Sequence, residues 1–296
     1  PQKPAVEATA TGSEGGGDRA AQLESLRARI RALTDKGRTK AAEEAVRVKE
    51  RRDAGLEALP FVREESAYGP LFSRVKRYPV TQRHGSVPLH AALEASGDAV
   101  SMLCLDRALL GFHAPGALYL DTETTGLAGG TGTLAFLVGI AWFEGKEFCC
   151  EQLFLSEPYA ERALLERLAD RIENATALVT YNGKAFDMPL LRARYVLSRR
   201  PPPREPPHVD LVHAARRVYG ARVDGCRLVT LEREVLGFVR EGDVPSGEIP
   251  MRYTNYLRQG LAEPLQAVIE HNLWDVIAMA ALLGELAART DGLESQ

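Results

Sequence analysis

The stretch that decides the fold is ALYLDTETTGL, residues 117–127, in which an apolar run leads into two carboxylates one residue apart. The run from Ala117 to Leu120 is typical of a buried strand, and side chains two positions apart in a strand project from the same face. Asp121 and Glu123 are therefore expected to point the same way. Like charges in that position raise each other's pKa unless a cation lies between them, although an isolated pair could also end a strand in water.

The composition is that of an ordinary globular protein. The chain has 296 residues, of which 45% are hydrophobic and 26% charged, and a formal net charge of −3. That charge excludes a polycationic protein, so any nucleic-acid binding must come from local patches. The four cysteines show no metal-site spacing, and we expect free thiols in a reducing cytoplasm. The longest apolar run, 134–143, is about half of the roughly 20 residues of a membrane helix, so no membrane partner is expected.

The pattern of residue types divides the chain into four parts. Residues 1–19 are polar, small and Gly-rich, and we expect a flexible tail. Residues 20–58 have apolar residues at three- and four-residue steps, which predicts a helical appendage that is either a surface helix or binds a protein partner. Residues 59–116 predict an accessory α/β segment that packs on the main domain expected at 117–290, and His84 in it is interpreted as a surface or turn residue.

The last part of the chain predicts a mixed sheet. A meander of strands, followed by strands that alternate with helices, is typical of a mixed α/β sheet. The fold class is therefore α/β, a mixed β-sheet flanked by helices, with an N-terminal helical appendage. The expected strands lie at 117–122, 133–143, 147–155 and 177–181, and the expected helices at 159–175, 187–199 and through most of 227–290.

A third acidic residue, Asp187, follows the fourth predicted strand in the segment YNGKAFD, residues 181–187. An Asp at this place, with Pro189 in the first turn, suits a helix N-cap, which is a sufficient structural explanation. The cap does not explain Asn182 and Lys184, which suit a phosphate or a sugar. Both interpretations of Asp187 stay open.

A fourth acidic residue, Asp275, lies in HNLWDVIAMAALL, residues 271–283, a helix that is apolar nearly all round and is expected to be buried. An unpaired buried carboxylate is costly or becomes neutral, so Asp275 needs a partner. His271 lies one helical turn earlier on the same face and could pair with it. A metal shared with other carboxylates would satisfy Asp275 equally well, and it would also account for Asp121 and Glu123.

Three regions far apart in the sequence thus each end an apolar element with an acidic group. Mg²⁺ and Mn²⁺ prefer oxygen ligands of this kind. Two such ions, about 3.5–4 Å apart, hold the attacking and leaving oxygens of a phosphoryl displacement. His271 would then be the general base that takes a proton from the attacking water.

The motifs resemble those of the DEDD (DnaQ-like) 3′→5′ exonuclease superfamily, a branch of the ribonuclease H-like fold. LDTETTGL looks like the first motif of that superfamily, YNGKAFD the second and HNLWD the last. Within it, the chain is most similar to the YprB-type ribonuclease H-like proteins. That likeness covers about 117–285 and rests on DTETTGLAGGTGTLAFLVG, TYNGKAFDMPLLRARY, HVDLVHAARR and CRLVTLEREVLG.

The resemblance implies a mixed sheet in ribonuclease H order, two divalent cations (Mg²⁺ or Mn²⁺) and His271 as the base. It implies four metal-binding catalytic carboxylates: Asp121, Glu123, Asp187 and Asp275. Asp210, in HVDL, would support the ligands from behind or would be a cap or strand-end residue. One departure is that the histidine branch of the superfamily usually has His-x-x-x-x-Asp, whereas His271 and Asp275 have the spacing of its tyrosine branch, Tyr-x-x-x-Asp.

The expected substrate is the end of a single-stranded DNA or RNA. Thr124, Asn182 and Lys184 are interpreted as contacts to the reacting end of the strand, and Tyr181 as a base-stacking residue. Phe186 and Trp274 could also stack on a base, but core packing is the expected role of both.

A local basic region could follow a phosphate backbone. Residues 192–233 hold ten Arg against four Asp or Glu, but these arginines could instead pair with acids elsewhere.

Competing functions are separated by context. GTGTLA, residues 130–135, fits a dinucleotide-binding fingerprint, but it continues as a strand rather than a helix, which argues against a dehydrogenase. The presence of all four acids argues against a nucleic-acid-binding module without activity. An endonuclease of the same fold stays open. The expected function is a cytoplasmic, two-metal-dependent 3′→5′ exonuclease.

Overall fold

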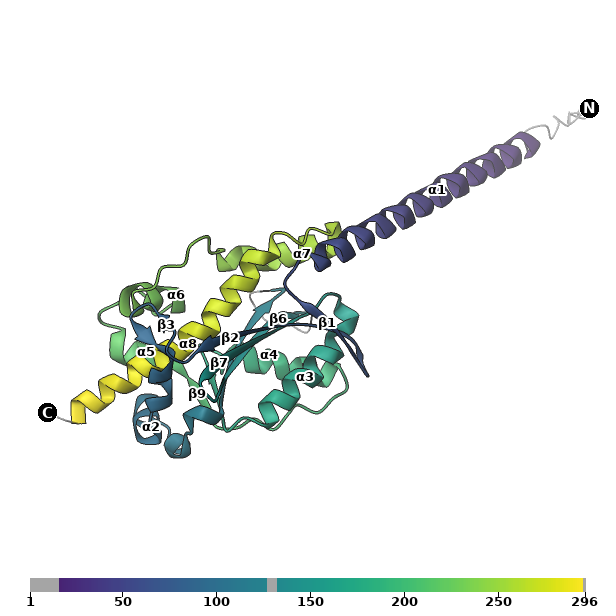
Figure 1. Ribbon diagram of the computed structural model, residues 1–296. Coiled ribbons are helices and arrows are strands. Elements are labelled where there is room, and N and C mark those ends of the chain that lie inside the picture. The colour runs from purple at the N-terminus through teal and green to yellow at the C-terminus, as the bar shows by residue number, and fades with distance from the viewer. Residues whose placement is uncertain (1–15, 127–131, 295–296) are drawn as a thin grey trace, which may run out of the picture. The chain divides into compact units, whose positions relative to one another are not determined.

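The computed structural model describes the chain except for residues 1–15, 127–131 and 295–296 (Figure 1). Most of the expected tail, and Gly130 and Thr131 of the segment GTGTLA, lie outside the described residues. The chain divides into two units, residues 1–50 and 51–296.

The described part of the first unit is helical. It belongs to α1, Gly16–Glu57, whose last residues enter the second unit. The apolar positions that predicted the helix are exposed, from 53% at Leu23 to 70% at Leu33. The helix therefore presents its apolar residues to its surroundings rather than to a core of its own unit.

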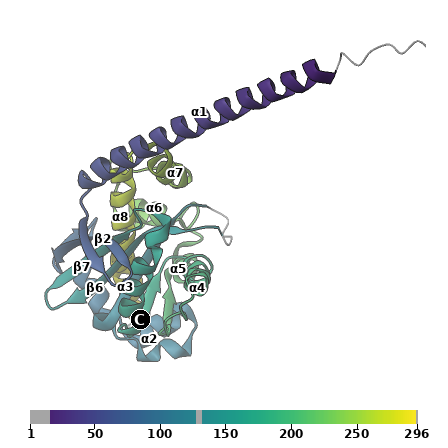
Figure 2. The same cartoon turned by 90° about the vertical axis from the view of Figure 1, so that its right-hand side faces the viewer.

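The second unit is built on a mixed sheet of seven strands in the order β1-β2-β7-β6-β5-β8-β9. β5, β8 and β9 run parallel to one another, and every other neighbouring pair in this sheet is antiparallel. β1 and β2, from the expected accessory segment 59–116, extend the sheet through β7, and β2, β6 and β7 lie side by side in Figure 2. The strands are β1 (Val62–Ser66), β2 (Gly69–Pro79), β5 (Ala117–Thr124), β6 (Ala135–Glu144), β7 (Glu147–Phe154), β8 (Ala177–Thr180) and β9 (His208–Asp210), with a separate pair β3 (Arg83–His84) and β4 (Val87–Pro88).

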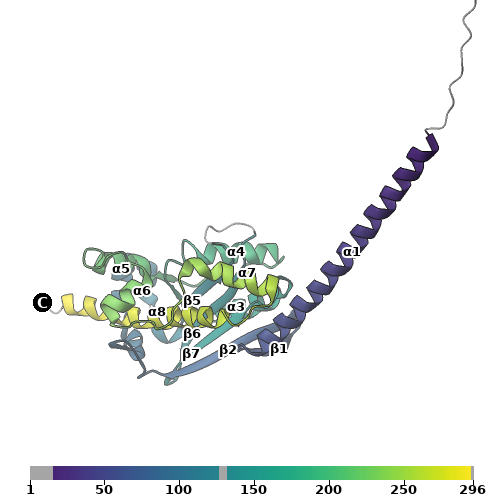
Figure 3. The same cartoon turned by 90° about the horizontal axis from the view of Figure 1, so that it is seen from above.

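Helices cover both faces of this sheet, so the predicted α/β class is confirmed. α8 runs beside β5, β6 and β7 (Figure 3) and shares one core with α2 and α5. α3, α4 and α7 form the core of the other face. The helices are α2 (Gly97–Cys104), α3 (Glu161–Glu173), α4 (Asp187–Leu197), α5 (Leu211–Tyr219), α6 (Leu228–Leu231), α7 (Ile249–Gln259) and α8 (Leu265–Glu294). Short 3₁₀ or π turns occupy Leu89–Glu94, Arg107–Gly111, Ala114–Gly116, Pro158–Ala160, Glu232–Leu236 and Ser246–Glu248.

The alternation along β5 decides which face its acids reach. Ala117 and Tyr119 belong to the core under α8, whereas Leu118 and Leu120 belong to the core of the opposite face. Positions 121 and 123 continue the first series, so they point toward α8.

α8 is the predicted buried helix. By length and composition, Leu265–Thr290 could cross a membrane, but 78% of its apolar window is buried inside the structure. A helix that is apolar all round and covered by protein is typical of a core helix.

Candidate metal centre

Asp121 and Glu123 lie near the C-terminal end of β5, on the side of the sheet where the parallel strands β8 and β9 also end. Glu123 is buried and Asp121 is half-buried. Burial raises the pKa of both carboxyls well above the usual range, and repulsion from neighbouring carboxylates, with Asp275 and Asp187 among them, raises it further. The two groups are thus held where their negative charge is costly.

α8 brings His271 and Asp275 to the same place. His271 Nε2 lies 3.4 Å from Asp275 Oδ2 and 3.9 Å from Glu123 Oε1. Ligand atoms of these three residues all lie within 4.8 Å of one another. The His–Asp pair considered from the sequence is present, but it forms part of a larger cluster to which a metal ion could bind.

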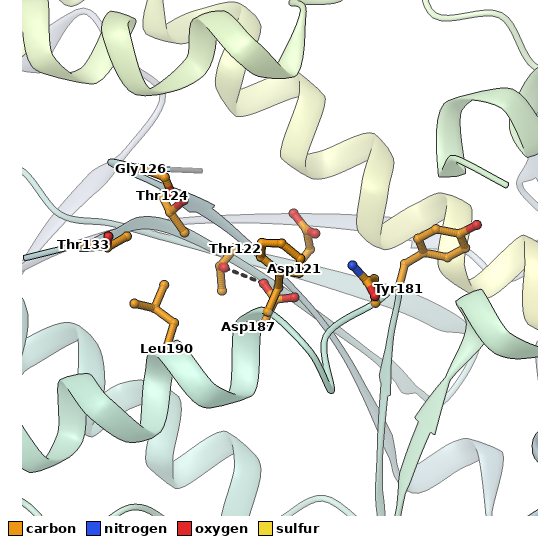
Figure 4. A pocket seen from close by; sticks show the side chains of 10 residues that line it. Asp121, Thr122, Thr124, Gly126, Thr133, Tyr181, Asp187 and Leu190 are labelled. Carbon is orange, nitrogen blue, oxygen red and sulfur yellow. Dashed lines mark hydrogen bonds between the residues drawn. The ribbon is translucent and has the colours of Figure 1, made fainter. Parts of the chain in front are cut away.

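Asp187 reaches the centre from the start of α4. Its Oδ1 accepts a hydrogen bond of 2.5 Å from the Thr122 hydroxyl (Figure 4). Burial raises the pKa of Asp187 to about 6, although this hydrogen bond lowers it. The N-cap position of α4 is Phe186, without a side-chain cap bond among the described residues, so the interpretation of Asp187 as the cap is wrong.

Asp210 fixes the loop that carries Asp187. Its carboxylate accepts hydrogen bonds from the backbone N–H of Asn182 (2.7 Å) and of Lys184 (3.0 Å), and it also caps α5 through Val212 N–H (3.3 Å). Asn182 has a φ of 65°, in the left-handed region, where asparagine is one of the more tolerant residues. The carboxylate of Asp210 therefore stabilises the conformation of the loop between β8 and α4.

A buried amide pair that the sequence analysis missed holds Asp121. Asn272 Nδ2 donates to Asp121 Oδ2 at 2.8 Å, and its Oδ1 accepts from Gln152 Nε2 at 3.0 Å. Both amides are buried. A Cβ at Gly139 would lie 2.4 Å from Asn272 Oδ1, so glycine on β6 makes room for this amide. The sequence does contain a signal for this contact: Asn272 is a polar residue in a helix expected to be buried, and a buried amide needs a hydrogen-bond partner.

A second missed group is Arg240, whose side chain is only 2% exposed. Its guanidinium donates to Asp275 Oδ1 at 2.6 Å and to Glu232 Oε2 at 2.7 Å. Glu232 is fully buried, and its other oxygen lies 2.7 Å from His84 Nε2. His84 is 4% exposed and stacks on Phe238, so its interpretation as a surface or turn residue is wrong.

Asp243 sets the orientation of His271. Asp243 Oδ1 lies 2.6 Å from His271 Nδ1, and Arg240 Nη1 lies 3.3 Å from the same nitrogen. A ring nitrogen cannot donate to the carboxylate and accept from the guanidinium at once, and the shorter distance favours donation to Asp243. In that tautomer of the neutral ring, Nε2 carries no hydrogen and faces Glu123 and Asp275.

Among the cavities beside the centre, two are both lined by Asp121, Tyr181 and Asn182. The first, of about 280 Å³, is also lined by Asp187, Thr122, Thr124, Gly126, Thr133, Phe186 and Leu190 (Figure 4). The second, of about 410 Å³, is also lined by His271, Asp275, Ser246, Arg240, Arg216, Arg227 and the chain around Leu228. Of the four predicted substrate contacts, Thr124, Asn182 and Tyr181 therefore lie at the centre, whereas exposed Lys184 lines neither cavity.

The predicted core packing of Phe186 is wrong. Its side chain is 57% exposed at the wall of the first cavity. Trp274 is half-buried and belongs to neither of the two described cores. It has Phe238 at its edge and the Arg240 guanidinium 5.7 Å from the centroid of its ring.

The charges of the centre leave it strongly negative. Among the described residues, Arg240 is the permanent cation that forms an ion pair with the centre, and it is shared between Asp275 and buried Glu232. The carboxylates of Asp121, Glu123 and Asp187 have no such partner in the described part of the chain. Carboxylate oxygens fit hard divalent ions such as Mg²⁺ and Mn²⁺, so the four carboxylates suit the expected metals.

Comparison with known proteins places these residues in context. A family model described as the RNase_H superfamily matches residues 118–287. Uncharacterized protein YprB of Bacillus subtilis (strain 168) is 34% identical over 237 residues, which make up 76% of this chain and 57% of YprB, so the chain spans just over half of that relative. The family B DNA polymerase from the hyperthermophilic archaeon Pyrobaculum calidifontis is 17% identical, with a TM-score of 0.45 over 60% of this chain and 28% of the polymerase, a weak similarity.

Proposed function

The chain belongs to the RNase_H superfamily, and from that membership we propose that it is a metal-dependent nuclease that hydrolyses phosphodiester bonds. The observation that best supports this proposal is the meeting of carboxylates from separate segments at one site. They come from β5, from the start of α4 and from α8: Asp121, Glu123, Asp187 and Asp275.

These four carboxylates are proposed to hold two divalent cations, Mg²⁺ or Mn²⁺. When bound, such ions supply positive charge for the attacking and leaving oxygens of the phosphate. Asn272 would hold Asp121 and Thr122 would hold Asp187, so that each carboxylate keeps one orientation.

His271 is proposed to accept the proton of the attacking water. Its Nε2 points into the acidic cluster, and Asp243 holds the opposite nitrogen. The tyrosine-like spacing of His271 and Asp275 is compatible with this role, because a step of four residues on α8 leaves both side chains on one face.

We propose 3′→5′ exonuclease action on single-stranded DNA or RNA. The exposed ring of Phe186 beside Asp187 offers a surface on which a terminal base can stack, and Thr124, Asn182 and Tyr181 line the same cavity. An endonuclease of the same fold is the second candidate, since a second cavity of larger volume is lined by Asp275. The described cysteines are free thiols, and we propose a cytoplasmic location.

The test uses purified protein and 5′-labelled single-stranded DNA and RNA oligonucleotides with Mg²⁺ or Mn²⁺. Parallel reactions contain EDTA, or the variants Glu123→Gln and Asp275→Asn. A metal-dependent ladder that shortens from the 3′ end, and that both variants lack, is the expected result. Internal cuts would favour the endonuclease, whereas binding without cleavage would reject the catalytic proposal.

A further inference from the structure

Three arginines line the second cavity, and two of them form no ion pair with the described acidic residues. Arg240 donates to Asp275 and Glu232, and it forms a longer ion pair with Asp243. Arg216 and Arg227 are exposed, and within the described chain neither side chain forms a hydrogen bond or an ion pair. These two guanidinium groups therefore remain available to an anion next to the acidic centre.

The other arginines of the basic region are used elsewhere or lie away from this cavity. Four of them pair with acids in the described structure: Arg192 with Glu205, Arg194 with Glu161, Arg200 with Glu166 and Arg233 with Glu234. Arg217 donates to the Leu103 carbonyl. The side chains of the remaining three, Arg199, Arg204 and Arg222, line neither cavity at the centre. The structure thus reduces ten candidate phosphate contacts to two.

The segment that carries these two arginines is held in place. Arg216 lies in the last turn of α5, and Arg227 directly precedes α6. Between them, Val223 is buried, and the Tyr181 hydroxyl donates to the Cys226 carbonyl at 2.5 Å. Because Tyr181 also lines both cavities at the centre, this bond ties the basic segment to the end of β8.

A third cavity, of about 540 Å³, adjoins Arg227. Its lining also includes Val229, Asp243, Pro245, Ser246 and His271. Val229 is 44% exposed and provides an apolar surface beside the arginine. Arg227 and Val229 also line the second cavity, so the two cavities adjoin each other beside the centre.

We propose that Arg216 and Arg227 bind the backbone phosphates of the nucleic-acid strand in the second cavity, which Phe186 does not line. This inference rests on the proposed nuclease function and deepens it by assigning the path of the strand next to the cleaved bond. The contacts are to phosphate rather than to bases, so binding is independent of sequence and depends on salt.

The test measures binding separately from cleavage. A fluorescein-labelled 12-residue oligothymidylate is titrated in Ca²⁺ buffer between 50 and 200 mM NaCl and followed by anisotropy, and its length is checked on a gel afterwards. At low salt, Arg216→Ala and Arg227→Ala are each expected to weaken binding about 3–10-fold. Each is also expected to make the negative slope of log K against log salt less steep by about 0.7, because one phosphate contact is lost. Lysine at either position should restore most of the slope.

Arg204→Ala is the matched control, because Arg204 is an exposed arginine of the same basic region that lines neither cavity at the centre. It should bind and cleave like the wild type. With cleavable substrate and Mg²⁺, the double variant Arg216→Ala/Arg227→Ala should show a raised KM and an unchanged kcat. An unchanged affinity and slope in a folded double variant, with cleavage intact, overturns this inference and leaves the nuclease proposal standing. A wild type that neither binds nor cleaves rejects both.

Discussion

Arg240 Nη2 donates to Asp275 Oδ1 at 2.6 Å, while the other oxygen of the same carboxylate faces His271 Nε2 at 3.4 Å. One oxygen is thus held by a fixed guanidinium, and the other remains directed into the acidic cluster. Because Arg240 also pairs with buried Glu232, its charge does not neutralise the centre. Asp275 is thus held in one orientation, while the negative charge of the centre that Arg240 does not neutralise can be balanced by a bound cation.

This surplus predicts that divalent metal stabilises the fold. Mg²⁺ or Mn²⁺ at 100 times its Kd should raise the free energy of unfolding by about 2.7 kcal/mol, because the ion binds the assembled carboxylates and not the unfolded chain. Urea titrations with metal and with EDTA measure this difference. In Glu123→Gln, which lacks one ligand, the same metal concentration should stabilise less. Equal stabilisation of both proteins would place the bound ion elsewhere.

Asn272→Ala should lower metal affinity or nuclease activity about 10–100-fold, because Asp121 loses the donor that orients it. Metal titrations of activity, with calorimetry of Mn²⁺ binding, separate the two effects. Asn174→Ala is the control, since the amide of Asn174 donates only to the exposed end of α3. Wild-type metal dependence in a folded Asn272→Ala would show that Asp121 needs no such support.

Gly139→Ala should have a similar effect on activity without touching any acidic residue. The new Cβ would lie 2.4 Å from Asn272 Oδ1, so the amide must move away from Asp121. Overpacking of this kind also costs about 1–3 kcal/mol of stability, which thermal unfolding will detect. Gly111→Ala, with no atom within 4 Å of its added Cβ, should leave both properties unchanged.

The parts of the fold and site that the sequence predicted are those fixed by local geometry. A strand has only two faces, so the spacing of Asp121 and Glu123 sufficed to direct them together. The step from His271 to Asp275 placed them on one helical face in the same way. The apolar surroundings of Asp275 also predicted that this helix would be buried, because a surface helix keeps a polar face.

The features that the sequence did not predict depend on contacts between distant segments. Glu232 is 148 positions from His84, and Asp121 is 151 positions from Asn272. Arg240 lies in an irregular stretch after Gly237, where neither helical nor strand periodicity indicates the direction of a side chain. Phe186 looked like a core residue by type alone, yet its position just before α4 leaves it at a cavity wall.

The buried contact between His84 and Glu232 predicts a stabilising role for the β3–β4 hairpin. His84→Ala should lower the free energy of unfolding by about 1–3 kcal/mol, since one oxygen of a fully buried carboxylate loses its partner. Urea unfolding measures the loss. His213→Ala, at an exposed position on α5, should change stability little. A stable His84→Ala protein would mean that Arg240 alone satisfies Glu232.

Asp187 predicts how stability depends on pH in the metal-free protein. Its pKa in the folded state is raised from 3.8 to about 6, so folding favours the protonated form. Its contribution is fully favourable below pH 3.8 and is lost as the pH rises through about 6, because the unfolded chain gives up its proton earlier. In EDTA, the free energy of unfolding of wild type minus that of Asp187→Asn should therefore fall across this interval and level off above it. Saturating Mg²⁺ should reduce the fall, because the metal favours the ionised carboxylate. A flat difference in EDTA would contradict the proposed burial of this carboxyl at the centre.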